Sequence, residues 1–526
     1  MSSASDDTEQ AEVLRFLAEP GHHGAGVDRV ERIETHGAYV FLAGDSAIKI
    51  KRAVSFSYMD FSTLALRETA IRHELAVNRE AAPGIYRDVA PITRDTDGGL
   101  RWAGTGEVVE WALRMRRFAQ SELLSARIDA GHYDQSLLQR LADVVAASHG
   151  RAAVMRPKGQ VARLDRIAGD ICHVLHNAAG GDVALAAEVD RLGVSFRNQV
   201  RRWASLIEAR AQAGFVRRCH GDLHLDNVVV LAEQPVLFDA IEFSEEIATV
   251  DILYDLAFLL MDLCHRGQIS SANAVLNRYL WRDACDATLE GLSLLALFIG
   301  LRAGIRAMVS AQRATQSHDD GGDLARAYVA TAMAALAPFE PRLVAVGGLS
   351  GSGKSTLAAS VAPLLGSIPG AVHLRSDLER KTLAGVNDDT RLPPTAYTRD
   401  AGVRVYRRLL DRAERALRAG RCVVVDAVFA NEAERQSVAD VAARAGVRFD
   451  GLWLTAERET LLDRVASRRG DASDATAAVV MQQFERELGP VTWTIVDSSG
   501  SPDVVLDHTK ILLELDETPP EAISGP

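Results

Sequence analysis

A glycine-rich loop that begins at residue 348 is the feature that most constrains the fold of this chain. It follows an apolar run at 343–346, which is typical of a buried β-strand, and it precedes a helical pattern that continues to residue 365. This order of residues is typical of a strand, followed by a tight turn and the N-terminus of a helix. The sequence therefore predicts an α/β domain with a mainly parallel sheet around this loop.

The loop itself has the chemistry of a phosphate site. It reads Gly-Leu-Ser-Gly-Ser-Gly-Lys-Ser-Thr, which is Gly-x-x-x-x-Gly-Lys-Ser in the required strand–loop–helix context. Backbone N–H groups of such a loop enclose phosphate at a helix N-terminus, the lysine reaches the β- and γ-phosphates, and the serine hydroxyl ligates Mg²⁺. A Gly/Ser-rich linker would explain neither the strand nor the Lys-Ser pair. The residues expected to bind the nucleotide are Gly348, Ser350, Gly351, Ser352, Gly353, Lys354, Ser355 and Thr356, with Ser355 also on the metal.

Further strand patterns after the loop complete a five-strand α/β unit. One leads into Ser-Asp377-Leu-Glu-Arg380, and a later one contains Val-Val-Val-Asp426. A helical pattern then places Arg464 and Arg468 four residues apart on one face, although a solvated arginine-rich helix is the alternative interpretation. The strands are expected at 343–346, from 372 into the Asp-x-x-Arg motif, and at 421–429, 449–455 and 493–496.

A second polar constellation lies between residues 219 and 243. Asp222 precedes Asn227 by five positions, which is the spacing of a kinase catalytic loop in which Asp accepts a hydroxyl proton and Asn holds Mg²⁺. Two short apolar runs around a turn follow, so a hairpin is predicted to return Asp239 beside Asn227. A second acidic Mg²⁺ ligand belongs at that position. The sequence therefore predicts a phosphoryl-transfer site here.

A metal site of another kind is the alternative for this stretch. His220, Asp222, His224 and Asp226 alternate, so one face of a strand could offer four ligands to a metal such as Zn²⁺. Asn227 and the later acidic residue have no role in that alternative, so we favour phosphoryl transfer.

A lysine strand upstream supports the same chemistry. Residues 47–51 read Ala-Ile-Lys-Ile-Lys, and alternation puts Lys49 and Lys51 on one face. A cleft-facing lysine of such a strand touches the ATP phosphates and pairs with a helix glutamate. We expect Lys49 to be that lysine, Lys51 to be solvated, and Glu74 to be the partner. The alternatives to Glu74 on the same helical pattern are Glu68 and Glu80.

The regions around these motifs have coarser assignments. Residues 107–116 read as a strand that leads into an interlobe hinge, with backbone groups at 110–115 meeting adenine; an ordinary buried strand is equally compatible. Residues 121–214 are mainly helical and would accommodate the acceptor. Helical patterns dominate again from residue 243 to about 337.

The motif His-Gly-Asp222, with Asn227 and Asp239, resembles the aminoglycoside phosphotransferase and choline kinase family, whose members are relatives of protein kinases. The resemblance implies an α+β bilobal protein-kinase-like domain that phosphorylates a small-molecule hydroxyl with ATP. It also implies Asp222 as the base and Asn227 and Asp239 on Mg²⁺, and it suggests that Asp251 or Asp255 braces the catalytic loop. In a bacterial subgroup of this family the domain is often fused to a P-loop kinase.

The C-terminal half resembles small P-loop kinases, including gluconate kinase-like and polynucleotide kinase-like proteins. By that resemblance Asp377 is the acceptor-side base, Arg380 binds the acceptor, and Asp426 supports Mg²⁺. Arg464 and Arg468 would belong to a lid that meets the transferring phosphoryl group. The expected fold is an α/β P-loop NTPase domain.

Composition narrows the class of protein. The formal net charge is −12 without long acidic blocks, which argues against a dedicated duplex-DNA binder. Five dispersed cysteines without a Cys-x-x-Cys indicate neither a disulfide framework nor a zinc site, and they fit a reduced compartment. The N-terminus is polar and acidic, unlike a signal peptide, and the longest apolar run is about half of the ~20 residues of a membrane span. We expect a cytoplasmic protein that does not bind membranes.

These features predict two kinase-type active sites, each using ATP and Mg²⁺ to phosphorylate a hydroxyl of a small-molecule acceptor. Two alternatives remain open. One half could be a non-catalytic ATP-binding regulatory module, or the P-loop half could phosphorylate a nucleic-acid end or a nucleotide sugar. The sequence names neither the acceptors nor the oligomeric state. The expected organisation is an N-terminal extension at 1–25, a kinase-like domain at 26–337, a P-loop domain at 341–516 and a disordered tail at 517–526.

Overall fold

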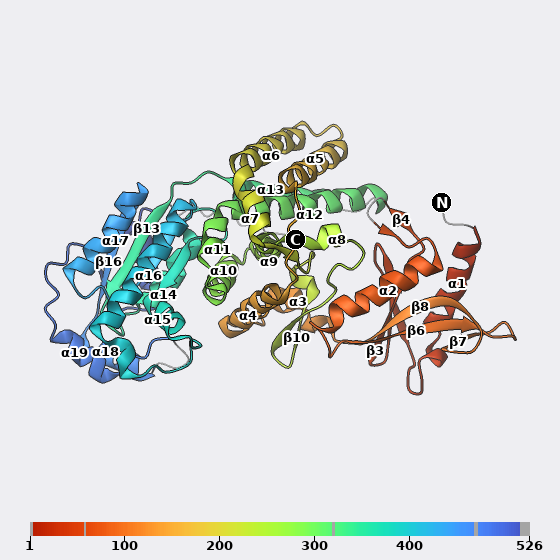
Figure 1. The fold of residues 1–526 in the computed structure, drawn as a ribbon, viewed down its shortest axis with the longest axis horizontal. Helices are drawn as coiled ribbons and strands as arrows, with labels where there is room; N and C mark the ends of the chain where they lie inside the picture. The colour runs from red at the N-terminus through yellow and green to blue at the C-terminus, as the bar shows by residue number, and fades with distance from the viewer. Residues whose placement is uncertain (1–3, 57–58, 318–320, 468–471, 516–526) are drawn as a thin grey trace. The chain divides into compact units, whose positions relative to one another are not determined.

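The chain forms two compact units in the computed structural model, which describes residues 4–56, 59–317, 321–467 and 472–515 (Figure 1). The first unit comprises Met1–Arg156 and Gly214–Asp255, and the second comprises Pro157–Ala213 and Leu256–Pro526. The predicted tail at 517–526 and the candidate lid residue Arg468 lie outside the described residues.

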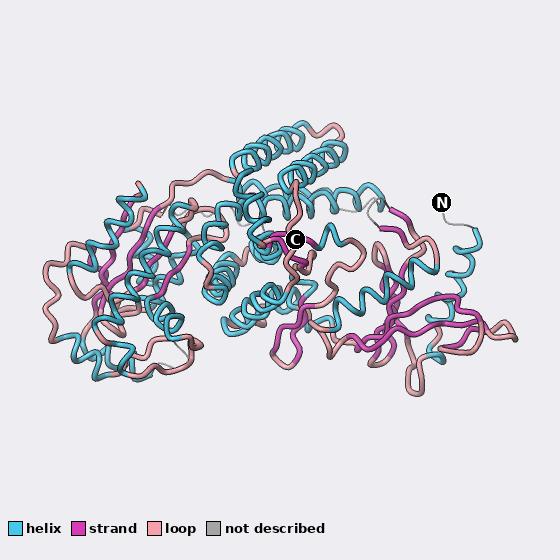
Figure 2. The backbone as a smooth tube through the Cα atoms, in the orientation of Figure 1, coloured by secondary structure: helices cyan, strands magenta, loops and turns pink. Residues whose placement is uncertain are grey.

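An antiparallel sheet of six strands, in the order β1-β2-β3-β8-β6-β7, forms one part of the first unit (Figure 2). Alternation gives the sheet two apolar faces. Ile48 and Ile50 pack with Leu17 of helix α1, whereas Ala47 packs with Ile71 of helix α2 on the other side. The elements are α1 (Ala4–Ala18), β1 (Val30–Glu34), β2 (Ala38–Ala43), β3 (Ser46–Lys51), β4 (Ser55–Phe56), β5 (Met59–Asp60), α2 (Leu64–Arg79), β6 (Tyr86–Arg94), β7 (Leu100–Trp102) and β8 (Glu107–Arg116).

Strand β8 lies in the middle of this sheet. It pairs with β3 through residues 112–116 and with β6 through residues 107–115. Both ladders use the backbone groups at 112–115, and residues 110 and 111 pair with β6. The interpretation that backbone groups at 110–115 meet adenine is therefore wrong, and the ordinary buried strand is right. Alternating polarity predicts the strand but not how many neighbours it has.

The rest of the first unit carries the stretch that the sequence predicts to be catalytic. Strands β10 and β11 form the predicted antiparallel hairpin, with Val228 opposite Leu237. The elements are α3 (Leu124–Asp129), α4 (Gln135–Arg151), β9 (Val216–Arg218), the 3₁₀ turn η3 (Leu225–Asn227), β10 (Val228–Leu231), β11 (Gln234–Leu237), α8 (Glu245–Ala248), β12 (Thr249–Asp251) and the start of α9 (Ile252–His265).

Helices fill the first part of the second unit. One stretch, Asp286–Ala314, is long and apolar enough to cross a membrane by length and composition alone, and 67% of its tested window is buried, as in a core helix. The helices are α5 (Gln160–Ala179), α6 (Val183–Arg202), α7 (Ala204–Ala213), α10 (Ile269–Asp283), α11 (Asp286–Gly291), α12 (Leu295–Ser317) and α13 (Gly321–Leu336).

A five-stranded parallel sheet, in the order β14-β15-β13-β16-β17, forms the remainder of the second unit, as the sequence predicts. Its core joins Val344 and Val346 of the central strand to Leu357 of the helix that follows the glycine-rich loop. The elements are β13 (Arg342–Gly348), α14 (Lys354–Val361), β14 (Val372–Arg375), α15 (Ser376–Ala384), α16 (Arg399–Arg418), β15 (Val423–Asp426), α17 (Glu432–Ala445), β16 (Arg448–Thr455), α18 (Arg458–Ser467), α19 (Ala477–Phe484), β17 (Thr494–Asp497) and α20 (Pro502–Leu512).

Candidate active sites

In the first unit, Lys49 joins two carboxylates from different elements. Its Nζ lies 2.7 Å from Glu74 Oε1 of α2 and 2.7 Å from Asp239 Oδ1, just after β11. Burial lowers the pKa of Lys49, but the charges of Asp239 and Glu74 outweigh burial and raise it well above its usual value. The sequence alternatives to Glu74 lie elsewhere, since Glu68 pairs with Arg72 and Glu80 is exposed.

Lys51 is buried, so the expectation of a solvated lysine is wrong. Its side chain is 3% exposed, its Nζ lies 2.6 Å from Glu74 Oε2, and it also contacts Glu242. Alternation does place Lys51 on the same face as Lys49. That face is covered by α2 and by the segment after Asp239, which the strand pattern alone does not reveal. Burial of Glu242 raises its pKa, although Lys51 partly offsets the effect.

The proposed base and metal ligand lie in one loop. The Asn227 side-chain amide donates to the Asp222 backbone oxygen at 2.9 Å and to Asp222 Oδ2 at 3.0 Å. Phe238 N donates to Asn227 O at 3.1 Å, so the hairpin returns Asp239 next to the loop, as its spacing predicts. The side chains of Asp222 and Asp239 are each 41% exposed, so a ligand can reach both from solvent.

Asp255 braces this loop. It accepts hydrogen bonds from Gly221 N at 2.8 Å and from His220 N at 3.3 Å, and its Oδ2 lies 3.1 Å from His149 Nε2. Asp251, the other candidate for this role, accepts from Leu253 N at the start of α9.

The loop does not have the geometry of the alternative four-ligand metal site. His220 Nε2 lies 2.9 Å from the Phe238 carbonyl, so this nitrogen is already engaged in a hydrogen bond. Burial lowers the pKa of His220 despite the acidic groups near it, so the ring is neutral. Within the described residues, one group with metal-ligating atoms close together is His149, Cys219 and Asp255. Its carboxylate already accepts the two backbone hydrogen bonds of the loop.

Two residues that the sequence argument missed hold Asp239 in place. Asp239 has a φ of +60°, a left-handed conformation that is strained for a residue with a side chain. Tyr86 Oη accepts from Asp239 N at 3.0 Å, and Asn78 Oδ1 accepts from Ala240 N at 2.7 Å. Asn78 is four residues after Glu74 on α2, so helical spacing could have identified it as a second residue on the same face.

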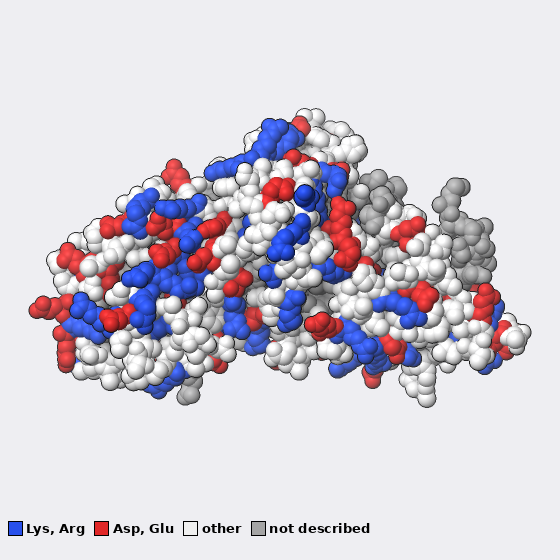
Figure 3. All heavy atoms as spheres, viewed as in Figure 1, with Lys and Arg blue, Asp and Glu red and all other residues white. Residues whose placement is uncertain are grey.

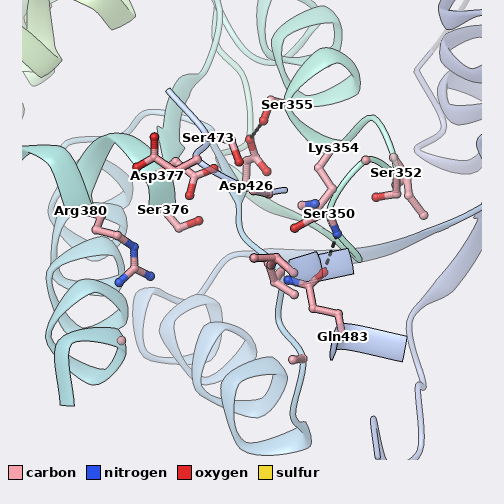
Figure 4. A pocket seen from close by; sticks show the side chains of 18 of the residues that line it. Ser350, Ser352, Lys354, Ser355, Ser376, Asp377, Arg380, Asp426, Ser473 and Gln483 are labelled. Atoms are coloured by element: carbon pink, nitrogen blue, oxygen red, sulfur yellow. Dashed lines mark hydrogen bonds between the residues drawn. The ribbon is translucent and has the colours of Figure 1, made fainter. Parts of the chain in front are cut away.

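In the second unit the glycine-rich loop leaves the end of the central strand β13 and enters α14. A Cβ on Gly348 would lie 2.6 Å from Leu454 O, and one on Gly351 would lie 2.5 Å from Leu461 O. Both positions therefore require glycine. Gly353 caps α14 with a φ of +84°. Lys354 Nζ donates to Leu349 O at 2.9 Å, and Ser350 N donates to Gln483 Oε1 of α19 at 2.8 Å (Figure 4).

Ser355 and Asp426 meet beside the loop, where the Ser355 hydroxyl donates to Asp426 Oδ2 (Figure 4). Burial raises the pKa of Asp426, but the His373 ring and the charges of Arg375 and Lys354 outweigh it and hold the pKa at about 2. His373 Nε2 lies 3.9 Å and Arg375 Nε 3.7 Å from Asp426 Oδ2. An ionised carboxylate at the end of β15 and a hydroxyl in the first turn of α14 suit a hard cation.

A cavity of about 1540 Å³ opens in front of the loop. Asp377 and Arg380, both on α15, line it (Figure 4). Arg380 donates to Ala396 O at 2.7 Å and lies over the ring of Tyr397. Arg464 also lines the cavity and donates to Ser498 O at 2.8 Å, which favours a cavity residue over a solvated arginine helix.

The residues present fit the groups that kinase chemistry requires. Among the described residues, the buried Ser352 hydroxyl has no hydrogen-bond partner, and it lies in the loop where phosphate oxygens would be bound. The donors around Asp239 and around Asp426 are carboxylate, amide and hydroxyl oxygens, the ligands that Mg²⁺ prefers.

Comparisons with known proteins match the two parts of the chain to two different families. The family described as "Phosphotransferase enzyme family" matches residues 65–294, and the family described as "AAA domain" matches residues 343–487. The chain is 30% identical over 480 residues to "Uncharacterized protein Rv2004c" of Mycobacterium tuberculosis, covering 89% of this chain and 92% of that protein. The values are the same for "Uncharacterized protein Mb2027c" of Mycobacterium bovis.

Solved structures resemble each half separately. A choline/ethanolamine kinase family protein from Mesorhizobium loti aligns with a TM-score of 0.39 and 20% identity, covering 63% of this chain and 95% of that chain. A gluconokinase from Sinorhizobium meliloti aligns with a TM-score of 0.25 and 20% identity, covering 34% and 94%.

The fold and the family matches define an ATP-dependent kinase in which a phosphotransferase domain precedes a P-loop domain. Both domains are of kinase type, which implies that they bind ATP. The chain belongs to the same family as the mycobacterial proteins named above.

Proposed function

We propose that both halves are active, and that each transfers the γ-phosphoryl group of ATP to a hydroxyl of a small-molecule acceptor. The observation that carries this proposal is that each half brings together side chains of the kinds that phosphoryl transfer uses. Lys49 with Glu74 and Asp239 supports it for the first unit, and the glycine-rich loop with Ser355 and Asp426 supports it for the second. The proposal includes the domain limits 26–337 and 341–516 and a cytoplasmic location, which the five free cysteines support.

In the phosphotransferase half, Lys49 binds the ATP phosphates while Glu74 fixes its position. Asp222 takes the proton of the acceptor hydroxyl as its oxygen bonds to the γ-phosphorus and the bond to the ADP oxygen breaks. Asn227 and Asp239 would hold Mg²⁺, which neutralises phosphate charge when bound. A positioned base of this kind contributes ~10²–10⁴-fold to rate.

In the P-loop half, residues 348–356 bind the phosphates, with Lys354 on the β- and γ-groups. Ser355 and Asp426 would hold Mg²⁺. Asp377 takes the proton of the acceptor hydroxyl, Arg380 binds the acceptor, and Arg464 stabilises the transferring group from the α18 side.

ATP-binding stoichiometry tests the two-site proposal. Equilibrium dialysis with Mg²⁺–ATP is expected to give two nucleotides per wild-type chain, and one in either Lys49→Ala or Lys354→Ala. A regulatory module would still bind ATP, so turnover decides between it and an enzyme. If Asp222→Asn or Asp377→Asn removes no product, the corresponding half is regulatory.

We further propose that the acceptor of the P-loop half is anionic, because of the charges around its cavity. Four carboxylates line it, of which Asp426 is engaged by Ser355, Glu434 by the Asn431 cap, and Asp474 by Lys381 at 2.9 Å. Among the described residues, none of the six lining arginines forms an ion pair. Figure 3 shows basic side chains gathered over α16 with acidic ones among them. Two of them, Arg380 and Arg464, donate to backbone carbonyls, and the others are Arg391, Arg399, Arg407 and Arg486.

Matched acceptor pairs test this charge preference: sugars with sugar phosphates or sugar acids, and nucleosides with nucleotides. We expect products that depend on Lys354 only from the anionic members, and an increased acceptor KM in Arg399→Ala and Arg407→Ala. Arg404→Ala, on the same helix but outside the cavity lining, is the control. Equal turnover of neutral acceptors would contradict the preference, and turnover of 5′-hydroxyl oligonucleotides alone would favour the nucleic-acid alternative.

A further inference from the structure

Helix α10 lies in the segment that matches the phosphotransferase family, yet within the second unit it packs on the edge strand of the P-loop sheet. Among the strands of the described residues, β14 has a neighbour, β15, on one side only. Its other edge faces α10. An unpaired strand edge in a folded protein must be covered or solvated, since its backbone groups need partners.

Two asparagines of α10 supply those partners. Asn277 Oδ1 accepts from His373 N at 2.7 Å, and its Nδ2 donates to Ala371 O at 3.2 Å. In a parallel ladder, one residue bonds the carbonyl before and the N–H after its partner residue. The Asn277 amide makes this same pair of bonds around residue 372, so it substitutes for a missing strand. Asn273, which is 3% exposed, donates to Ala371 O at 2.9 Å and to Pro369 O at 3.0 Å.

A third side chain on the same face of α10 holds the far end of this segment. Trp281 Nε1 donates to Leu378 O at 3.2 Å, and Trp281 is 9% exposed. Residues 273, 277 and 281 are spaced by four, so they form one stripe along the helix. Asp377 lines the cavity. Along the chain it lies between His373, which bonds Asn277, and Leu378, which bonds Trp281.

We infer that Asn277 and Trp281 are positioning residues for the P-loop kinase, because they fix the segment that delivers Asp377 to the cavity. The inference rests on the proposed role of Asp377. By sequence, α10 belongs to the phosphotransferase half, but it supports the active site of the P-loop half. A displacement of about 1 Å at a reacting group can cost ~10²-fold in rate, so small shifts of β14 matter.

The test uses full-length protein in an Asp222→Asn background, so that only the P-loop site turns over. ADP release from Mg²⁺–ATP is measured with a pool of sugar phosphates, sugar acids and nucleotides. We expect Asn277→Ala and Trp281→Phe to lower kcat about 10- to 100-fold while the KM for ATP changes less than about twofold. Ser270→Ala, an exposed position on the same helix, is the matched control and leaves both unchanged.

A double-mutant cycle separates positioning from general structural support. If Asn277 acts through Asp377, then Asn277→Ala causes no further loss in an Asp377→Asn background. Full additivity of the two losses overturns the positioning role. If Asp377→Asn alone retains wild-type turnover, the proposed base is wrong, which is a separate failure.

Hydrogen exchange tests the bracing of β14 by α10 without a measurement of turnover. The peptide containing His373 N–H is expected to exchange faster in Asn277→Ala than in Ser270→Ala, with unchanged binding of a fluorescent ATP analogue. Unchanged exchange overturns the bracing of β14 by α10. Faster exchange with unchanged kcat overturns the positioning role.

Discussion

Lys51 and Glu74 form a buried ion pair, with Lys51 Nζ 2.6 Å from Glu74 Oε2. The other oxygen of the same carboxylate, Oε1, lies 2.7 Å from Lys49 Nζ. Glu74 therefore forms ion pairs with both lysines of strand β3. Only Lys49 also reaches Asp239, whereas Lys51 contacts the buried Glu242. Replacement of Lys51 and replacement of Lys49 should therefore have different effects on the protein.

Lys51→Met should destabilise the protein, because it leaves Glu242 buried without its cation. Removal of one partner of a buried pair costs about 3–5 kcal/mol. Lys49→Met should mainly abolish the turnover that depends on Asp222. Urea unfolding and ADP release on both variants test the distinction. A Lys51→Met protein as stable as the wild type would contradict the account.

The charge of Glu74 predicts a pH dependence. Burial would raise its pKa, but Lys49 and Lys51 hold it at about 2, below the ~4.3 of an exposed glutamate. A depressed pKa stabilises the folded state fully above the unfolded value, and this contribution is lost as the pH falls toward the folded value. The difference in urea midpoint between wild type and Glu74→Gln should be constant from about pH 6 to 8 and shrink below about pH 4. A difference that persists unchanged at about pH 3 would contradict the prediction.

Asp255→Asn should impair the phosphotransferase site alone. An amide in place of the carboxylate would direct N–H groups at the backbone of Gly221 or His220, and an unsatisfied buried group costs about 1–3 kcal/mol. We expect loss of products that depend on Asp222 and retention of products that depend on Lys354. Asp251→Asn is the control, since asparagine also caps a helix. Equal losses in both variants would mean that Asp255 has no special role.

Gly351→Ala should remove one of the two bound nucleotides. Its Cβ would lie 2.5 Å from Leu461 O, and the residue has a φ of +87°. Gly385 is the control, because it has a φ of +68° but a Cβ added there would meet nothing within 4 Å. Equilibrium dialysis should give one ATP per chain for Gly351→Ala and two for Gly385→Ala. Two nucleotides in the Gly351 variant would exclude this loop as a nucleotide site.

Local sequence patterns were sufficient for the parts of the fold that depend on neighbours in the chain. The five parallel strands, the hairpin after Asn227 and the shared face of Lys49 and Lys51 all follow from periodicity and turn chemistry. The Lys49–Glu74 contact also forms as expected, because a strand lysine and the next helix meet over a short stretch of chain.

Features set by distant packing could not be read in the same way. Burial of Lys51 depends on Glu242, which is far along the chain, and the central position of β8 depends on which strands pair with it. The contacts of Asn277 with β14 depend on a helix that matches a different family from the strand it covers. An asparagine within an otherwise helical pattern gives no sign of such a partner.

The most direct test of two active sites is an acceptor screen by ³¹P NMR with Mg²⁺–ATP. Pooled sugars, sugar phosphates, amino sugars, nucleosides and nucleotides are incubated with wild type, Asp222→Asn and Lys354→Ala. The account predicts one set of phosphorylated products that is lost only in Asp222→Asn and another that is lost only in Lys354→Ala. If every product survives one of these substitutions, the chain has a single active site, and the claim of two kinases in one protein is contradicted.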